Sequence, residues 1–214
     1  MLIPLGSVRL EGDLVIPENA KGFVLFVHGS GSSRFSPRNR FVAKILQEEG
    51  LATLLFDLLT KDEEKEDMYD GHLRFDIRFL SSRLIDVTKA VIENNTDIKN
   101  LRMGYFGAST GAAAALVAAA IQNENIKAVV SRGGRPDLAD SYLQKVMSPT
   151  LLIVGGNDKE VIKLNKEALE NIKVEKKLVI VPNATHLFEE PGTLEKVAEL
   201  ASKWFLKYLH SSNL

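Results

Sequence analysis

Short apolar runs alternate with longer amphipathic segments along most of this chain, and this alternation limits the folds open to it. Six runs are almost wholly apolar, which is typical of strands buried on both faces of a parallel sheet. They occupy residues 23–27, 53–56, 103–106, 128–130, 151–154 and 178–181. We predict a strand at each of them.

Helical patterns fill the intervals, at residues 38–49, 75–94, 110–122, 138–145, 159–172 and 193–209. Strand and helix repeated in this order predict a doubly wound α/β fold, with a mostly parallel sheet and helices on both of its faces. The 214 residues, 45% of them apolar, are enough for one well-packed core. We therefore expect residues 1–214 to form a single domain.

Two segments depart from the alternation. Residues 8–16 alternate weakly and are interrupted by Glu11-Gly12-Asp13, which predicts an antiparallel hairpin at the edge of the sheet. Residues 61–67 are nearly all charged, and we expect them to form an exposed loop with no role beyond solvation.

The composition narrows the partners. Lys and Arg (27) nearly balance Asp and Glu (28), so the chain lacks the positive field that draws proteins to nucleic acid or anionic lipid. There is no cysteine, which excludes disulfides and a thiol nucleophile. The N-terminal residues lack a signal-peptide pattern, and no apolar run could span a bilayer. A cytoplasmic protein with a small-molecule partner is the expectation.

The strongest chemical signal is Gly107-Ala108-Ser109-Thr110-Gly111, directly after one predicted strand and directly before an alanine-rich helix. This is the strand–turn–helix context of a G-x-S-x-G nucleophile elbow, in which flanking glycines let strand and helix approach closely. Ser109 is therefore the predicted nucleophile. A helix-capping serine is the structural alternative.

A serine hydroxyl needs a base to activate it and an acid to orient the base. Asp158 and His186 each follow a later predicted strand, so both should emerge at the same sheet edge as Ser109. We predict Asp158 as the orienting acid and His186 as the base. Asp57, at the end of another strand, is the rival acid.

The loop His28-Gly29-Ser30-Gly31 follows the first parallel strand and can direct a backbone N–H at a developing oxyanion. We predict that the N–H groups of Ser30 and Thr110 form the oxyanion hole. His28 should brace this loop rather than transfer a proton.

Together, the His28 loop, the Ser109 elbow, the Gly155-Gly156-Asn157-Asp158 loop and Ala184-Thr185-His186 resemble the α/β-hydrolase superfamily, and in particular its small dienelactone-hydrolase-like members without a cap domain. The resemblance implies hydrolysis of an ester, lactone or related acyl bond, with no cofactor. Dienelactone hydrolases carry cysteine where this chain has Ser109, and this difference favours general esters over dienelactone as the substrate. A binding or receptor protein that keeps the fold without turnover is the alternative.

Two arginines could read an acidic group on the substrate. Arg34 lies in the oxyanion loop and Arg132 at the end of a predicted strand, and either could instead pair with protein carboxylates. The four histidines are too scattered for a metal site, so none is expected. Without a cap over the site, short acyl esters should react better than long ones.

Overall fold

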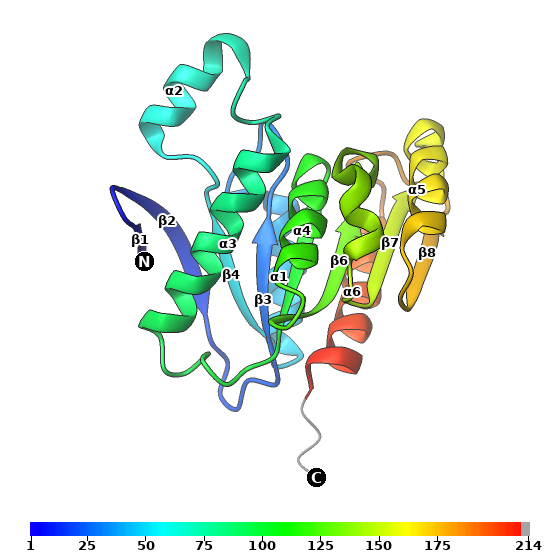
Figure 1. Cartoon of the computed structure of the whole chain (residues 1–214). Helices are drawn as coiled ribbons and strands as arrows, with labels where there is room; N and C mark the ends of the chain where they lie inside the picture. Colours follow the sequence, from blue (N-terminus) through cyan, green and yellow to red (C-terminus); the bar gives the residue numbers. More distant parts are fainter. Residues whose placement is uncertain (211–214) are drawn as a thin grey trace.

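A computed structural model describes residues 1–210 of the chain. Its eight strands form one sheet in the order β1-β2-β4-β3-β5-β6-β7-β8 (Figure 1). The strands are β1 (Leu2–Leu5), β2 (Val8–Val15), β3 (Phe23–Val27), β4 (Ala52–Phe56), β5 (Met103–Ala108), β6 (Ile126–Arg132), β7 (Thr150–Gly155) and β8 (Lys176–Val181). β1 and β2 are antiparallel to their neighbours, and β3 to β8 run parallel.

Helices cover both faces of the sheet, as the sequence predicts. They are α1 (Pro37–Glu48), α2 (Lys61–Asp70), α3 (Ile77–Asn94), α4 (Thr110–Ile121), the 3-10 segment η1 (Pro136–Lys145), α5 (Lys159–Asn171) and α6 (Thr193–Leu209). One apolar cluster joins the sheet to α3, α4, η1 and α5, and a second joins its other face to α1 and α6. The doubly wound α/β-hydrolase architecture is thereby confirmed, and residues 1–210 include no cap domain.

The central strands are buried at every position, and so is nearly all of α4. Most side chains of α4 are alanines, and because they are small, the helix can lie close against the middle of the sheet. Within residues 1–210, no helix has the length and apolarity needed to cross a membrane.

The N-terminal hairpin differs from the prediction. Glu11-Gly12-Asp13 does not turn; β2 runs straight through it, and the turn lies between β1 and β2. Gly12 instead serves close packing, because a Cβ there would lie 3.0 Å from a Leu54 methyl carbon. The glycine that was interpreted as a turn signal is a site of strand contact.

The charged run at residues 61–67 is also not a loop, because it forms most of α2. Thr60 and Glu63 make a capping box, each side chain bonding the other's backbone N–H. α2 rises above the carboxyl edge of the sheet (cyan in Figure 1). Asp67 is its one buried residue, so polar contacts hold the helix in place.

Two ion pairs supply those contacts. Glu63 pairs with Arg83 of α3, and Asp67 pairs with Arg74 and also accepts the N–H groups of Leu73 and Arg74. Although burial alone would raise it, these partners hold the pKa of the Asp67 carboxyl below its usual value. Two charged side chains about one turn apart, Glu63 and Asp67, therefore hold α2 in place.

Candidate active site

Ser109 sits between β5 and α4 with φ 50° and ψ −123°, a conformation that costs a non-glycine residue about 1–3 kcal/mol. The close approach of the two elements imposes it. A Cβ on Gly107 would collide with the backbone of Ala112, and one on Gly111 with the carbonyl oxygens of Val27 and His28. The turn thus has the strained geometry of a nucleophile elbow rather than of a simple helix cap, and Ser109 makes no side-chain capping bond.

His186 and Asp158 meet across two neighbouring loops. His186 Nδ1 lies 2.6 Å from Asp158 Oδ2, with Asp158 at the end of β7 and His186 after β8. Asn157 N donates to the Ala184 carbonyl at 2.9 Å, which ties the loops together. Gly155 allows this, because a Cβ there would lie 2.5 Å from the Ala184 and Thr185 oxygens.

Gly133 lies between the elbow and the histidine loop. The Ser109 N–H donates to the carbonyl of Arg132, the residue before Gly133, and a Cβ on Gly133 would lie 3.1 Å from the His186 oxygen and 3.5 Å from its Cε1. Ser109 and His186 are thus held on either side of one glycine. The structure has no hydrogen bond between the Ser109 hydroxyl and His186; such bonds are often long before substrate binds.

The rival acid Asp57 has other partners. Its carboxylate accepts the Arg34 N–H at 2.8 Å and pairs with the Arg34 guanidinium. Asp57 is therefore directed at Arg34, whereas Asp158 is directed at His186.

The two candidate oxyanion donors lie side by side. The Ser30 N–H donates to Thr110 Oγ1 at 2.9 Å, and a Cβ on Gly29 would lie 2.9 Å from Ser109 Cβ. The loop after β3 therefore packs directly on the nucleophile. In this state the Ser30 N–H is already hydrogen-bonded to the Thr110 hydroxyl oxygen.

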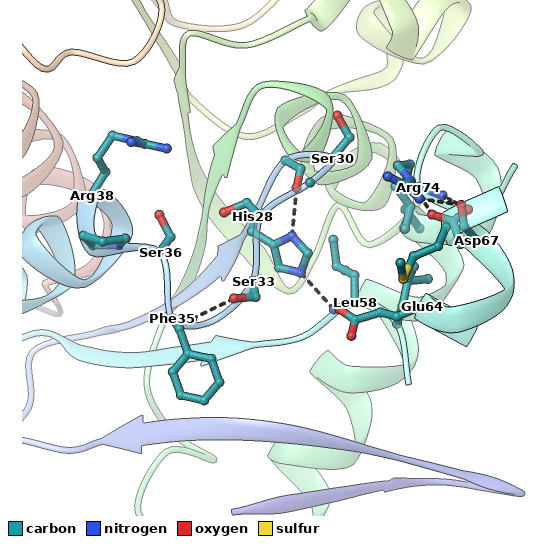
Figure 2. Close-up of a pocket in the computed structure, with 17 residues that line it drawn as sticks. His28, Ser30, Ser33, Phe35, Ser36, Arg38, Leu58, Glu64, Asp67 and Arg74 are labelled. Atoms are coloured by element: carbon teal, nitrogen blue, oxygen red, sulfur yellow. Dashed lines mark hydrogen bonds and ion pairs between the residues drawn. The ribbon is translucent and has the colours of Figure 1, made fainter. Parts of the chain in front are cut away.

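His28 connects this loop to the end of β4. Leu58 N donates to His28 Nε2 at 3.1 Å, so Nε2 is unprotonated and Nδ1–H donates to the Gly29 oxygen at 3.0 Å (Figure 2). Burial lowers the pKa of His28 below its usual value, against the opposing effect of the Gly29 bond. With both nitrogens engaged, His28 acts as a neutral brace.

Of the two candidate arginines, Arg34 is already paired. Its guanidinium contacts Glu11 and Asp57, with Asp13 at 3.9 Å, so the structure gives it the protein-pairing role left open from the sequence. Asp137 and Glu189 are not its partners, because Asp137 pairs with Arg135 and Glu189 with Arg38.

Arg132 is the opposite case. It is 6% exposed, and within residues 1–210 the one hydrogen-bonding partner of its guanidinium is Asn39 Oδ1, at 3.2 Å. Among the described residues no carboxylate lies within ion-pair distance, and its Nε is buried without a partner. Burial and the neighbouring Arg38 charge lower the pKa of Arg132 to about 10. A buried cation without a counter-ion is costly, so an anionic partner from outside the chain fits it.

A pocket of about 520 Å³ opens beside the oxyanion loop (Figure 2). It is bounded by residues 28–33 and 35–38, by Leu58, Leu59 and Leu80, and by Met68 and Glu64 of α2. The sequence interpretation missed α2 as a wall of this pocket. Thr60 followed three residues later by Glu63 is a helix-start signal that could have revealed it.

One group of side chains has the spacing of metal ligands. Asp67, Asp70 and His72 offer atoms within 4.8 Å of one another. Arg74 and backbone N–H groups already take the Asp67 carboxylate, and Asp70 Oδ1 contacts His72 Nδ1 at 2.6 Å. These internal bonds explain the cluster, and the absence of a metal site stays a prediction.

The sheet order, the strained Ser109 turn and the paired Asp158–His186 are the arrangement expected of the α/β-hydrolase fold. Residues 10–211 match the model of the dienelactone hydrolase family, and the chain belongs to that family. A crystal structure of dienelactone hydrolase from Anabaena variabilis is 60% identical, with a TM-score of 0.95, over 98% of this chain and 97% of that one. Est1E from Butyrivibrio proteoclasticus shares the fold at 18% identity and a TM-score of 0.80, over 97% of each chain.

Curated relatives from two strains of Mycobacterium tuberculosis are 56% identical over 204 residues. Each is named "Putative phosphoribosyl transferase". The match covers 95% of this chain and 45% of each relative, so the chain spans about half of their length.

Proposed function

We propose that this protein hydrolyses carboxylic esters, including lactones or thioesters, through an acyl-enzyme on Ser109. The observation that carries the proposal is the contact of His186 Nδ1 with Asp158 Oδ2 at 2.6 Å, at the sheet edge where the strained Ser109 turn stands. Asp158 fixes the tautomer that leaves His186 Nε2 free to accept a proton.

The reaction runs in two balanced halves. His186 takes the Ser109 proton while Oγ bonds to the substrate carbonyl carbon, and the carbonyl electrons move onto oxygen. As the intermediate collapses, the bond to the alcohol oxygen breaks and that oxygen receives the proton from His186. Water then repeats the sequence, releasing the acid and restoring the Ser109 hydroxyl.

The N–H groups of Thr110 and Ser30 would stabilise the oxyanion. For this the Ser30 amide must exchange Thr110 Oγ1 for the substrate oxygen, a local change within one loop contact. The Thr110 hydroxyl remains beside the oxyanion.

The name of the Mycobacterium relatives does not conflict with this proposal. They extend well beyond the segment shared with this chain, so phosphoribosyl transfer can belong to their other part. The shared segment is the one that contains the elbow.

Covalent labelling tests the proposal. A fluorophosphonate probe should label the parent protein at Ser109, and Ser109→Ala and His186→Ala should each lower kcat by about 10³–10⁶-fold with the fold intact. The double variant should be hardly worse than either single one. Absence of labelling would favour a binding protein with the same fold, whereas most activity surviving in Ser109→Ala would overturn the Ser109 mechanism.

A further inference from the structure

The pocket beside the oxyanion loop lies on one side of the nucleophile and His186 on the other. β5, which ends at Ser109, stands between β3 on one side and β6, β7 and β8 on the other. β4 leads into α2 (Figure 1), β3 leads into the loop that lines the pocket, and His186 follows β8 in the chain. The substrate carbonyl must therefore lie between these two regions.

The direction of proton transfer assigns the two parts of an ester. His186 returns the proton to the departing alcohol oxygen, so the alcohol part lies toward β8. The carbonyl oxygen lies at the Ser30 and Thr110 amides. The remaining substituent, the acyl group, extends over Gly29 toward the pocket, whose wall contacts Ser109 directly.

The chemistry of the pocket indicates what it accepts. Its floor consists of buried leucines, Leu58, Leu59 and Leu80, and Met68 stands exposed at its rim. Its volume of about 520 Å³ far exceeds an acetyl group and lies within the range of roughly 300–1,000 Å³ that buries small-molecule ligands.

The charges around the pocket disfavour an anion. Arg38 is paired with Glu189, and Arg74 with Asp67. Glu64 also lines the pocket and has no ion-pair partner within residues 1–210. Among the charged side chains that line the pocket, Glu64 alone forms no ion pair, and its negative charge would repel a carboxylate on the acyl group.

We propose that this pocket binds the acyl part of the substrate and selects uncharged, apolar acyl groups larger than acetyl. The proposal rests on the hydrolase function proposed above. It reverses the expectation of a short-acyl preference, because α2 supplies a wall that an uncapped fold would otherwise lack.

The test varies the acyl group at constant leaving group, using 4-nitrophenyl acetate, butyrate, hexanoate and octanoate. We expect kcat/KM to rise by about tenfold or more from acetate to hexanoate. Met68→Trp, which narrows the pocket from an exposed position (78%), should lower the ratio of kcat/KM for hexanoate to kcat/KM for acetate by about tenfold.

Met147→Trp is the matched control. Met147 is also exposed (60%), but it lies between η1 and β7 at the amino edge of the sheet, away from the pocket. The control should keep the parent profile. Equal effects of the two variants, or of Met68→Trp on acetate and hexanoate, would overturn the proposal.

Two further comparisons test direction and charge. Acetates of ethanol, butanol and hexanol should respond alike to Met68→Trp; selective loss of hexyl acetate would assign the pocket to the alcohol and refute the acyl assignment. The parent should prefer 4-nitrophenyl hexanoate to the mono-4-nitrophenyl ester of adipic acid, and Glu64→Gln should narrow that preference. An unchanged preference would refute the charge argument.

These results separate the two proposals. If Ser109 is labelled and the four 4-nitrophenyl esters are hydrolysed with equal kcat/KM, the acyl-pocket proposal fails while the hydrolase function stands. If Ser109 is neither labelled nor acylated by any ester, both fail.

Discussion

The backbone N–H of Ser30 donates a hydrogen bond to the Thr110 side-chain oxygen at 2.9 Å, joining two segments that are 80 residues apart in sequence. Both residues supply candidate oxyanion donors, and the bond fixes the Ser30 loop against the residue that follows the nucleophile. The Thr110 side chain is therefore placed to keep the two donors in register.

Thr110→Ala should lower kcat by about tenfold with little change in KM. Losing an oxyanion donor outright costs about 10²–10³-fold, and releasing the loop that positions one should cost less. Thr110→Ser keeps the hydroxyl and should stay near the parent rate. Steady-state kinetics on one ester would decide, and a faster Thr110→Ala enzyme would show that the hydroxyl competes with the substrate.

Asp158→Asn should lower kcat by about 10⁴-fold, since an amide would not hold the His186 tautomer that accepts the serine proton. Asp57→Asn should leave kcat within a few-fold of the parent and instead lower Tm, because Asp57 contacts Arg34 and not His186. Kinetics and thermal melts on both variants provide the check. The opposite ranking of kcat would make Asp57 the orienting acid.

The brace at His28 should make stability depend on pH. Its pKa is lowered in the folded state, so the stability it contributes is fully present above the usual histidine pKa of 6.5 and is lost as the pH falls from there through the lowered value. Protonation would place an N–H on Nε2 against the Leu58 N–H. The free energy of unfolding should therefore fall as the pH drops below the usual histidine pKa of 6.5.

His28→Gln can still accept the Leu58 N–H but does not titrate, so its urea-unfolding free energy should fall less over this range. His72→Gln is the control: Asp70 raises the pKa of His72, which gives the opposite sign. The same pH slope in His28→Gln and the parent would contradict the assignment.

We expect Arg132 to lower the stability of the fold and to contribute to substrate recognition. Because its buried charge has no carboxylate partner among the described residues, Arg132→Met should raise Tm. If the arginine holds an acidic group on the alcohol part of the substrate, the same variant should lose about tenfold or more in kcat/KM for 4-acetoxybenzoate relative to its methyl ester. Arg34→Met, which breaks existing ion pairs, should lower Tm and leave this preference unchanged.

The alternation of apolar runs was sufficient to predict the parallel strands and most helices, because burial on both faces leaves a direct mark on the sequence. The site residues were predictable for a related reason. Ser109 and Asp158 each follow a buried strand, His186 follows the edge strand β8, and parallel strands bring their carboxyl ends to one edge.

The errors arose where contacts between distant residues override local signals. Gly12 suggests a turn until Leu54 is known to pack against it, and the charged residues of α2 suggest a loop until Arg83 and Arg74 are known to pair with Glu63 and Asp67. The pairing of Arg34 with Asp57 and the isolation of Arg132 also depend on the folded arrangement, which no local pattern of the sequence records.

The attachment of α2 through Glu63 and Asp67, without a buried apolar side chain, separates what the chain needs to fold from what it needs to choose a substrate. Residues on the exposed surface of that helix can be exchanged without repacking the core. A lineage, or a designer, could therefore change selectivity through Met68 and its neighbours while the elbow and the sheet stay as they are. In this fold, ligand selectivity can therefore change at little cost in stability.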